Sequence, residues 1–456
     1  MWGARAPTGG VAWMRRAVVR EVGGPTGEWA MQLPGIGNKL KALTTGLDQL
    51  SKQAAGLPIA VDFGLRSLKV LQLSKGEPPS LVSAASIETP EDLLFDTGKR
   101  LAFQAEALPK LIRQGGFRGK RAVCAIPSSM AVCKHLQIQR ADGVPLQTLV
   151  ESTLPAQLRC DPDDIVFRFV EVAGVERGSG KAEVVAMASP REVVAKLMIA
   201  LREAKLEPVG IHTEYQAVLA AFEYLNKRLA DKLLTNLYVE IGACSTRVLI
   251  AHGGDLVFAR NIDVGGRLLD EMVAKQLKYT FNQAHEHRMK LSKLTPGDED
   301  TALVGAAVGS TAASGGVAGS TSFKKGDAED DRRIGVAPAG LSGDVRKGSP
   351  LAFQPRDVDL TEPLEILTDE ISMSLRYHES LFPSRKIDRA IFIGGESRHT
   401  GLVQHIARAL RLPAQVADPM ARVGRTGKEP SLGVDFGEGQ PGWTVPLGLC
   451  LAPTDL

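Results

Sequence analysis

Short apolar runs that end in polar turns alternate along this chain with segments whose apolar residues recur at helical spacing. The apolar runs predict strands at residues 57–64, 68–73, 121–127, 163–172, 182–188, 207–211, 236–242, 247–251, 256–261 and 387–393. Helical spacing predicts helices at residues 99–114, 191–204, 217–229, 266–291, 364–381 and 399–410. Strands and helices in this alternation indicate an α/β fold.

Two stretches show neither pattern. Residues 1–35 predict no regular structure and no secretory signal, because Arg20 and Glu21 interrupt the apolar run that begins at Ala17. A true start at Met31 is an alternative. Residues 296–350 are rich in Gly, Ala, Ser, Thr and charged residues, so we expect a flexible, disordered, low-complexity insertion there.

Residues 36–54 carry leucines at helical spacing, among them Leu40, Leu43 and Leu47, with lysines between them. We favour an amphipathic helix that packs on the folded chain, because aromatic membrane anchors are absent from this stripe. A helix that binds a membrane surface or a partner is the other interpretation. Residues 1–56 as a whole are expected to be a flexible N-terminal region.

Composition narrows the class of protein. A chain of 456 residues with 44% hydrophobic and 23% charged residues is globular and long enough for two to four domains of roughly 100–200 residues. A net charge of +3 does not favour nucleic-acid binding. Five scattered cysteines without metal-site spacing fit reduced thiols in a cytoplasm.

An internal repeat carries the candidate chemistry. Two segments align without a gap, and each places a carboxylate at the end of an apolar strand, Gly two residues later, Ser five later and a cation seven later. The first copy contains Asp62, Gly64, Ser67 and Lys69, and the second contains Glu240, Gly242, Ser245 and Arg247. Two matched copies suggest two similar half-domains that face one cleft.

These residue types suit a bound polyphosphate. Glycine lets the backbone turn tightly and approach a ligand, and successive N–H groups in such a turn bind phosphate oxygens. A carboxylate at a strand end can hold Mg²⁺, usually through water. A third glycine turn follows a strand at Gly394 and Gly395, where a nucleoside could lie against the backbone.

With these motifs the chain resembles the actin-like ATPases, and most closely the type IV pilus assembly protein PilM family on the branch shared with the division protein FtsA. The resemblance covers residues 57–451 apart from the insertion, and includes 59–73, 237–250, 264–277, 370–377, 391–402 and Leu447-Gly448-Leu449. It implies a two-lobed, ribonuclease H-like fold. The first lobe is expected at 57–234, with a small subdomain inserted at about 121–195, and the second lobe at 235–456.

The resemblance also implies roles by position for ATP and Mg²⁺. Asp62 and Glu240 are expected to hold the magnesium ion. The phosphates are expected to be lined by Gly64, Arg66, Ser67, Lys69, Gly242, Ser245 and Thr246. The nucleoside is expected to meet Gly394, Gly395 and Glu396, with Glu370 reaching the same pocket. Glu214 is the candidate catalytic residue that positions the attacking water, and an exposed carboxylate at a helix start is the equally weighted alternative.

Three positions depart from the family pattern. Glu240 stands where Asp is usual, Arg66 where a small residue is usual, and the segment around His285 matches an expected nucleoside contact only loosely. Arg66 could pair with a phosphate or crowd the turn. His285 and His287 are two residues apart and do not share a helix face, which argues against a metal site. These departures affect the expectation of hydrolysis more than that of binding.

The expected function is therefore an ATP-binding cytoplasmic component of a type IV pilus or type II secretion-like assembly platform, with at most slow ATPase activity. The resemblance implies a location at the inner-membrane face, peripheral to the membrane, and binding to the cytoplasmic tail of a PilN-like membrane protein, with a homo-oligomer also open. An FtsA-like membrane-associated filament protein is the alternative. A small-molecule kinase ranks last, because aspartate-rich substrate loops are not evident.

Overall fold

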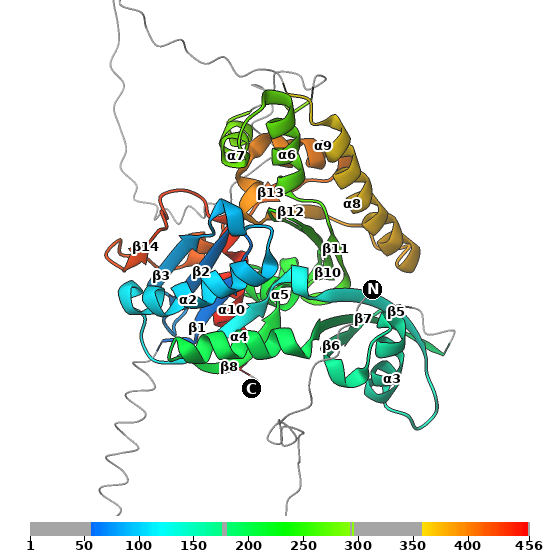
Figure 1. Cartoon of the computed structure of the whole chain (residues 1–456). Coiled ribbons are helices and arrows are strands. Elements are labelled where there is room, and N and C mark those ends of the chain that lie inside the picture. Colours follow the sequence, from blue (N-terminus) through cyan, green and yellow to red (C-terminus); the bar gives the residue numbers. More distant parts are fainter. Residues whose placement is uncertain (1–55, 176–179, 292–293, 296–357, 455–456) are drawn as a thin grey trace, which may run out of the picture. The chain divides into compact units, whose positions relative to one another are not determined.

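The computed structural model describes residues 56–175, 180–291, 294–295 and 358–454. The helix expected at 36–54 and the insertion expected at 296–350 lie outside the described residues. Within the described part, the strands form three sheets of six, five and three strands (Figure 1). The two hairpins predicted from the sequence repeat each belong to a different one of the two larger sheets.

The six-stranded sheet combines antiparallel and parallel neighbours. Its strands, in spatial order, are β14 (Ser431–Leu432), β3 (Leu81–Glu88), β2 (Ser67–Leu73), β1 (Ile59–Phe63), β4 (Arg121–Ile126) and β8 (Glu207–Thr213). β1, β2 and β3 are antiparallel, and β1, β4 and β8 are parallel. Strand β3 has no counterpart among the strands predicted from the sequence.

Alternation along β1 fills two layers on opposite faces of this sheet. Ile59, Val61 and Phe63 belong to one apolar cluster with residues of α2 (Thr97–Gly115) and α4 (Arg191–Glu203), whereas Ala60 belongs to another. Successive side chains of a strand point to opposite faces, so both faces must be covered by helices. The second face is covered by α5 (Glu214–Leu225) and the C-terminal helix α10 (Thr444–Leu451). We call this sheet with its helices the first lobe.

The five-stranded sheet and its helices form what we call the second lobe. Its strands, in spatial order, are β11 (Asp255–Ile262), β10 (Thr246–His252), β9 (Thr235–Ile241), β12 (Arg389–Ile393) and β13 (Ala414–Val416). Its helices are α6 (Gly266–Leu277), α7 (Phe281–Met289), α8 (Thr361–Leu381) and α9 (Thr400–Leu410). The boundary between the lobes expected near residue 234 stays a prediction. Strand β14 and helix α10 follow the second lobe in the chain but pack with the first.

The three-stranded sheet lies in the chain between β4 and β8. It contains β5 (Val132–Gln139), β7 (Lys181–Pro190) and β6 (Ile165–Glu171) in that spatial order, and α3 (Leu146–Leu158) packs on it. Strand β5 contacts the second lobe, where the His135 Nε2 lies 3.1 Å from the carbonyl oxygen of Ala259 on β11. The side chains of His135 and Phe258 also stack, with ring centroids 4.7 Å apart.

The predicted helix at 266–291 is wrong in one respect, because the structure has two helices there. Lys278 adopts the left-handed conformation and ends α6. Thr280 then begins α7 with a capping box, in which its side chain and that of Gln283 bond reciprocally to backbone N–H groups. The sequence signature of this box, Thr followed three residues later by Gln, is present in the chain.

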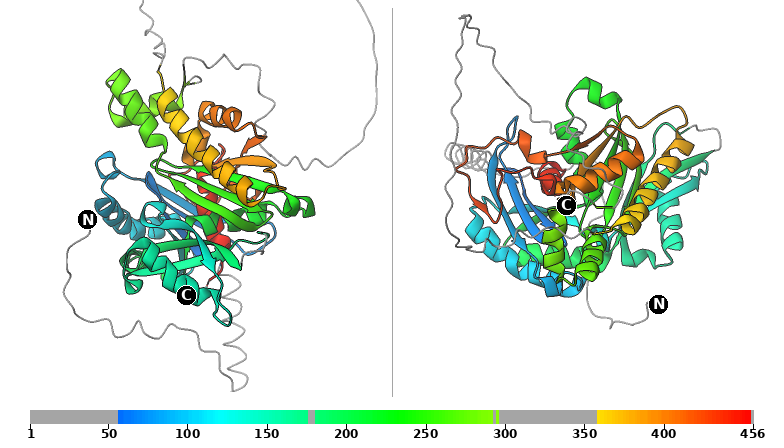
Figure 2. Two further views of the ribbon diagram at one scale, coloured as in Figure 1. Left: turned by 90° about the vertical axis from the view of Figure 1, so that its right-hand side faces the viewer. Right: turned by 90° about the horizontal axis from the view of Figure 1, so that it is seen from above.

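Helix α10 packs against α5 at very close range, beside the strands of the six-stranded sheet (Figure 2). A Cβ atom placed on Gly448 would lie 1.7 Å from the carbonyl oxygen of Ala217. No other residue type fits a contact this short, which explains the glycine in the Leu447-Gly448-Leu449 motif. None of the described helices is long and apolar enough to cross a membrane.

We predict that Gly448→Ala destabilises the protein by about 3 kcal/mol or more, because the added methyl must push α10 away from α5 in a close-packed core. The measurement is the free energy of unfolding in urea. Gly439→Ala is the matched control, since a Cβ at Gly439 would meet nothing within 4 Å. Equal stability of the two variants would contradict the close packing described.

Candidate functional site

The two repeated segments fold into the same turn. In β1–β2, Asp62 is the register partner of Lys69, and in β9–β10, Glu240 is the partner of Arg247. A Cβ on Gly64 would lie 2.8 Å from the carbonyl oxygen three residues later, and on Gly242 the equivalent distance is 2.9 Å. The sequence repeat is therefore a repeat of backbone geometry, and glycine is required at the same point of each turn.

Both turns open into one small cavity of about 130 Å³. The strand end at β12 also reaches it through Gly394 and Gly395, and α5 reaches it through its first residue. The structure brings these predicted site residues together at its wall: Asp62, Gly64, Arg66, Ser67, Lys69, Glu214, Glu240, Gly242, Ser245, Gly394, Gly395 and Glu396. A larger cavity of about 700 Å³ adjoins it and shares Arg66 and Glu396 with it.

Two predicted site residues lie elsewhere. Thr246 is fully buried and does not line the cavity. Its hydroxyl donates a hydrogen bond to the carbonyl oxygen of Val264 at 2.8 Å, which fixes the start of β10 beneath the turn. Glu370 lies on α8 and pairs with Arg260 of β11, and it lines neither cavity. The position of α8 against β11 turns Glu370 away from the pocket that the sequence assigned to it.

Arg247 is the centre of the buried charges around the small cavity. Its Nη2 and Nε atoms lie 2.6 and 2.9 Å from the two carboxylate oxygens of Glu240. Its Nη1 lies 2.5 Å from Glu214 and 2.6 Å from the hydroxyl of Ser128. All three charged side chains are nearly inaccessible to solvent. One guanidinium group therefore joins a carboxylate of the second lobe to a carboxylate of the first.

Burial shifts the proton affinities of this group. Burial raises the pKa of Glu214 to about 7, although the charge of Arg247 opposes the shift. Burial likewise raises the pKa of Asp62, with Lys69 opposing it and Glu240 adding to it. Desolvation acts to lower the pKa of Arg247, but the charges of Glu214 and Glu240 outweigh it and raise that pKa. Each of these carboxylates lies near another carboxylate, and the negative charge of its neighbour favours the binding of a proton or a cation.

The fit of a metal ion can be tested against this arrangement. The described residues contain no group of three or more His, Cys, Asp or Glu side chains placed to hold one. Asp62 and Glu240 do lie at the two strand ends, where one or two carboxylates suffice for a hydrated Mg²⁺. Arg247, however, takes both oxygens of Glu240 and supplies the positive charge that a metal would supply. A magnesium ion does not fit while this contact is formed.

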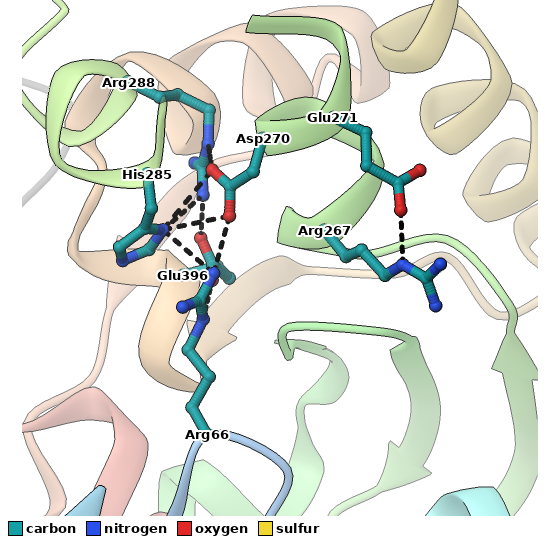
Figure 3. A network of polar contacts seen from close by, with 7 residues as sticks. All are labelled: Arg66, Arg267, Asp270, Glu271, His285, Arg288 and Glu396. Atoms are coloured by element: carbon teal, nitrogen blue, oxygen red, sulfur yellow. Dashed lines mark hydrogen bonds and ion pairs between the residues drawn. The ribbon is translucent and has the colours of Figure 1, made fainter. Parts of the chain in front are cut away.

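A second charged cluster lies where the small cavity meets the larger one (Figure 3). Arg66, from the β1–β2 turn, points toward Asp270 of α6, His285 and Arg288 of α7, and Glu396 after β12. Burial acts to raise the pKa of Asp270, but hydrogen bonds from His285 and the charge of Arg288 outweigh it and hold the pKa below its usual value. Asp270 is therefore a carboxylate anion.

Sequence reasoning missed part of this site. Ser128 carries no motif. Asp270 and Arg288 lie in segments that the resemblance covers, but it gave neither residue a role, and only the fold brings them to the cleft. The sequence repeat identifies Arg247 as the cation of the second copy, but its ion pair with Glu214 could not be inferred from the spacing of the motif. Glu214 does begin helix α5, yet its side chain is buried in the cleft, so the alternative of an exposed helix-start carboxylate is not what the structure shows.

Comparison with known proteins identifies relatives of this architecture. The sequence model of the family described as type IV pilus assembly protein PilM matches residues 60–303. A solved structure of a PilM-PilN type IV pilus biogenesis complex shares 18% identity, with a TM-score of 0.59, over 87% of this chain and 98% of that one. This likeness shows the fold, and the prediction of an actin-like α/β fold is confirmed.

Two more distant structures also match. The ethanolamine utilization protein EutJ from Carboxydothermus hydrogenoformans shares 14% identity over 86% of this chain and 89% of that one, with a TM-score of 0.41. MreB5 of Spiroplasma citri, bound to AMPPNP, shares 12% identity over 86% and 94%, with a TM-score of 0.38.

We predict that the stability of the protein falls as the pH rises from about 4.5 to about 7, in part because of Glu214. Its folded pKa lies above its unfolded value, so the folded state binds more protons in this window and loses stability as the pH rises through it. In Glu214→Gln this contribution is absent and the profile is flatter, by on the order of a few kcal/mol at most.

The measurement is the free energy of unfolding by urea at several pH values between 4 and 8. Glu192→Gln is the control, because Glu192 is an exposed carboxylate paired with Lys196 four residues later. This control should keep the wild-type slope. Parallel profiles for wild type and Glu214→Gln would show that Glu214 titrates normally.

Proposed function

The chain belongs to the PilM family of type IV pilus assembly proteins, and on that premise we propose that it binds the cytoplasmic tail of a PilN-like membrane protein and an adenine nucleotide. It would then act as a cytoplasmic platform component at the inner-membrane face, peripheral to the membrane. The observation that carries the proposal is a groove between the three-stranded sheet and the first lobe.

This groove has a volume of about 610 Å³, within the range of roughly 300–1,000 Å³ usual for ligand sites. One wall comes from the three-stranded sheet through Val166, Phe167 and Met187, and the other from the first lobe through Thr213 and Gln216. The lining is mixed, with apolar side chains such as Phe169 and Ile211 beside polar ones that include Arg168. Such a lining suits a short amphipathic peptide better than a highly charged ligand.

Strand β6 gives the groove a means to hold an extended peptide. It is the edge strand of its sheet, since among the described strands it pairs with β7 alone. An edge strand offers unpaired backbone N–H and C=O groups, and a peptide can add to it as a further strand while its side chains enter neighbouring pockets. The similar solved structure is a complex of PilM with PilN, which is consistent with a partner of this kind.

Nucleotide binding is proposed for the cleft between the two repeated turns. Gly64 and Gly242 provide the tight backbone turns, and Lys69 provides a cation beside them, its Nζ 2.9 Å from the carbonyl oxygen of Gly442. These are the groups that bind phosphate oxygens. The larger adjoining cavity has room for the nucleoside.

The metal and the catalytic residue remain part of this proposal. Asp62 and Glu240 are the residues that would hold a hydrated Mg²⁺, once Arg247 has left Glu240. Glu214, with a pKa raised to about 7, suits a group that orients a water molecule or takes its proton near neutral pH. Because Glu214 is paired with Arg247, we expect at most slow hydrolysis. A homo-oligomer is compatible with this function, whereas the FtsA-like alternative is not favoured.

We predict that Val166→Glu weakens binding of a PilN-like cytoplasmic peptide at least tenfold, because a buried charge in the groove would lose its hydration. Fluorescence anisotropy with a labelled peptide measures the affinity. Ile199→Glu is the matched control, since Ile199 is half exposed on α4 and lines no part of the groove. Equal loss in both variants, or no loss in Val166→Glu, would place the peptide elsewhere.

We also predict that Lys69→Ala weakens ATP binding at least tenfold, because it removes the cation beside the first glycine turn. Isothermal titration calorimetry measures the affinity. Lys99→Ala is the control, because Lys99 is an exposed residue of α2 that pairs with Asp96 at the start of that helix. Unchanged affinity in Lys69→Ala would remove this turn from the phosphate site. A wild-type chain that binds no ATP would contradict nucleotide binding altogether.

A further inference from the structure

Arg66 is the one member of the second charged cluster that comes from the first lobe. Its Nη2 lies 2.6 Å from Asp270 and 3.1 Å from the Nδ1 of His285, and its Nε lies 3.7 Å from Glu396. Asp270, His285, Arg288 and Glu396 all belong to the second lobe (Figure 3). We call these five residues the latch, because the contacts of Arg66 cross the cleft.

The second-lobe part of the latch places two carboxylates beside one arginine and one histidine. Arg288 lies between Asp270, at 2.6 Å, and Glu396, at 2.5 Å, so one buried cation faces two buried anions. Asp270 and Arg288 are fully buried, and Glu396 is 3% exposed. Buried carboxylates are costly unless they are well paired. The guanidinium of Arg66 adds positive charge to this pair of carboxylates from across the cleft, which favours closure of the cleft over the cluster.

Aromatic contacts reinforce the same junction. The ring of Phe95, from the first lobe, lies edge-on to Phe281 of α7 at 5.3 Å between centroids. Arg267 of α6 lies over the Phe95 ring at 3.9 Å from its centroid, and Arg66 lies 5.3 Å from that of Phe281. A cation over the face of an aromatic ring is attracted by the ring's negative electrostatic potential. The two lobes are therefore held together at this cluster by protein groups alone.

The latch also lies across the path that a nucleotide would occupy. Arg66 and Glu396 are among the residues that line both the small cavity and the larger adjoining one, so they lie where the two cavities meet. The small cavity, at about 130 Å³, is below the roughly 300 Å³ usual for ligand sites. Glu396 fills the space over Gly266 at the start of α6, where even a Cβ would lie 2.2 Å from its carboxyl carbon.

Two buried nitrogen atoms of the latch have no hydrogen-bond partner in the described part of the chain, so a ligand can compete for the contacts of Arg66. Among the described residues, the Nε of Arg66 and the Nη1 of Arg288 are buried atoms without a hydrogen-bond partner. Arg66 is 26% exposed, so it can leave the cluster toward the cleft. A phosphate group in the cleft would offer it a charge-assisted, two-point contact as good as that with Asp270.

We propose that the latch is an autoinhibitory contact, which holds the cleft closed in the nucleotide-free protein and competes with ATP for Arg66 and for the space of Glu396. This inference rests on the proposed nucleotide binding in the same cleft. Nucleotide then replaces one closing interaction by another, and its net affinity is reduced by the free energy needed to break the latch.

The test uses a variant that weakens the latch without changing the cavity wall. Asp270→Asn keeps the shape of the side chain, removes the charge that binds Arg66, and alters no residue that lines either cavity. Arg66→Ala removes the crossing contact from the other side. Arg140→Ala is the control, because its ion pair with Glu171 lies within the three-stranded sheet, away from the cleft.

Closure is read from Trp443, which is 2% exposed and lines the larger cavity. In a full-length chain with Trp2, Trp13 and Trp29 changed to Phe, it is the remaining tryptophan. We expect acrylamide to quench its fluorescence at least twice as strongly in nucleotide-free Asp270→Asn and Arg66→Ala as in wild type and Arg140→Ala. By calorimetry, Asp270→Asn should bind ATP about tenfold more tightly than wild type, with Arg140→Ala unchanged.

The outcomes separate the latch from the function on which it rests. Equal quenching in all variants would overturn the latch. An Asp270→Asn affinity for ATP equal to or below that of wild type would overturn the competition, while leaving nucleotide binding intact. If no variant binds ATP, nucleotide binding and the competition both fail, and the quenching alone decides closure. Should Asp270→Asn fail to fold by circular dichroism, the quenching of Arg66→Ala decides instead.

Discussion

Buried negative charge at the junction of the two lobes is the constraint on which the rest of this structure depends. Five carboxylates meet there, Asp62, Glu214, Glu240, Asp270 and Glu396, and all are nearly inaccessible to solvent. In each lobe an arginine forms an ion pair with a carboxylate of the other lobe. Arg247 of the second lobe pairs with Glu214 of the first, and Arg66 of the first pairs with Asp270 of the second. Separating the lobes therefore requires breaking both arginine contacts.

The first turn of α5 connects this junction to the groove proposed for the partner peptide. Glu214, the first residue of the helix, faces the cleft and pairs with Arg247, whereas Thr213 and Gln216 line the groove. Thr213 and Gln216 are joined by a capping box, so the turn is a stiff unit. The cleft and the groove therefore lie on opposite sides of one helical turn, and a movement of that turn would change both.

The sequence predicted those features that depend on local spacing. The repeat at Asp62 and Glu240 indicated two equivalent hairpins, because strand, glycine turn and strand are encoded within about ten residues. The pairing of Arg66 with Asp270 could not be foreseen, since the two residues are 204 positions apart and only the closed fold brings them together. Glu370 lies outside both cavities for a similar reason: its helix is readable from the spacing, but which face meets the pocket depends on packing against β11. The break between α6 and α7 is encoded locally by a capping box, yet apolar spacing continues on both sides of it and predicts one helix.

The choice of arginine at positions 66 and 247 follows from the geometry of these clusters. Arg247 contacts both oxygens of Glu240 and, through its remaining nitrogen, Glu214 and Ser128, which requires a planar group with several fixed donors. A lysine ammonium is a compact point charge with three donors on one atom, so it could not make the planar two-point contact with Glu240 while also reaching Glu214 and Ser128. Lys69, which has a single carboxylate at 3.9 Å, shows the contrasting case in the other copy of the repeat. The two copies thus share a backbone but differ in their cation: Lys69 contacts one carboxylate of its own lobe, whereas Arg247 joins carboxylates of both lobes.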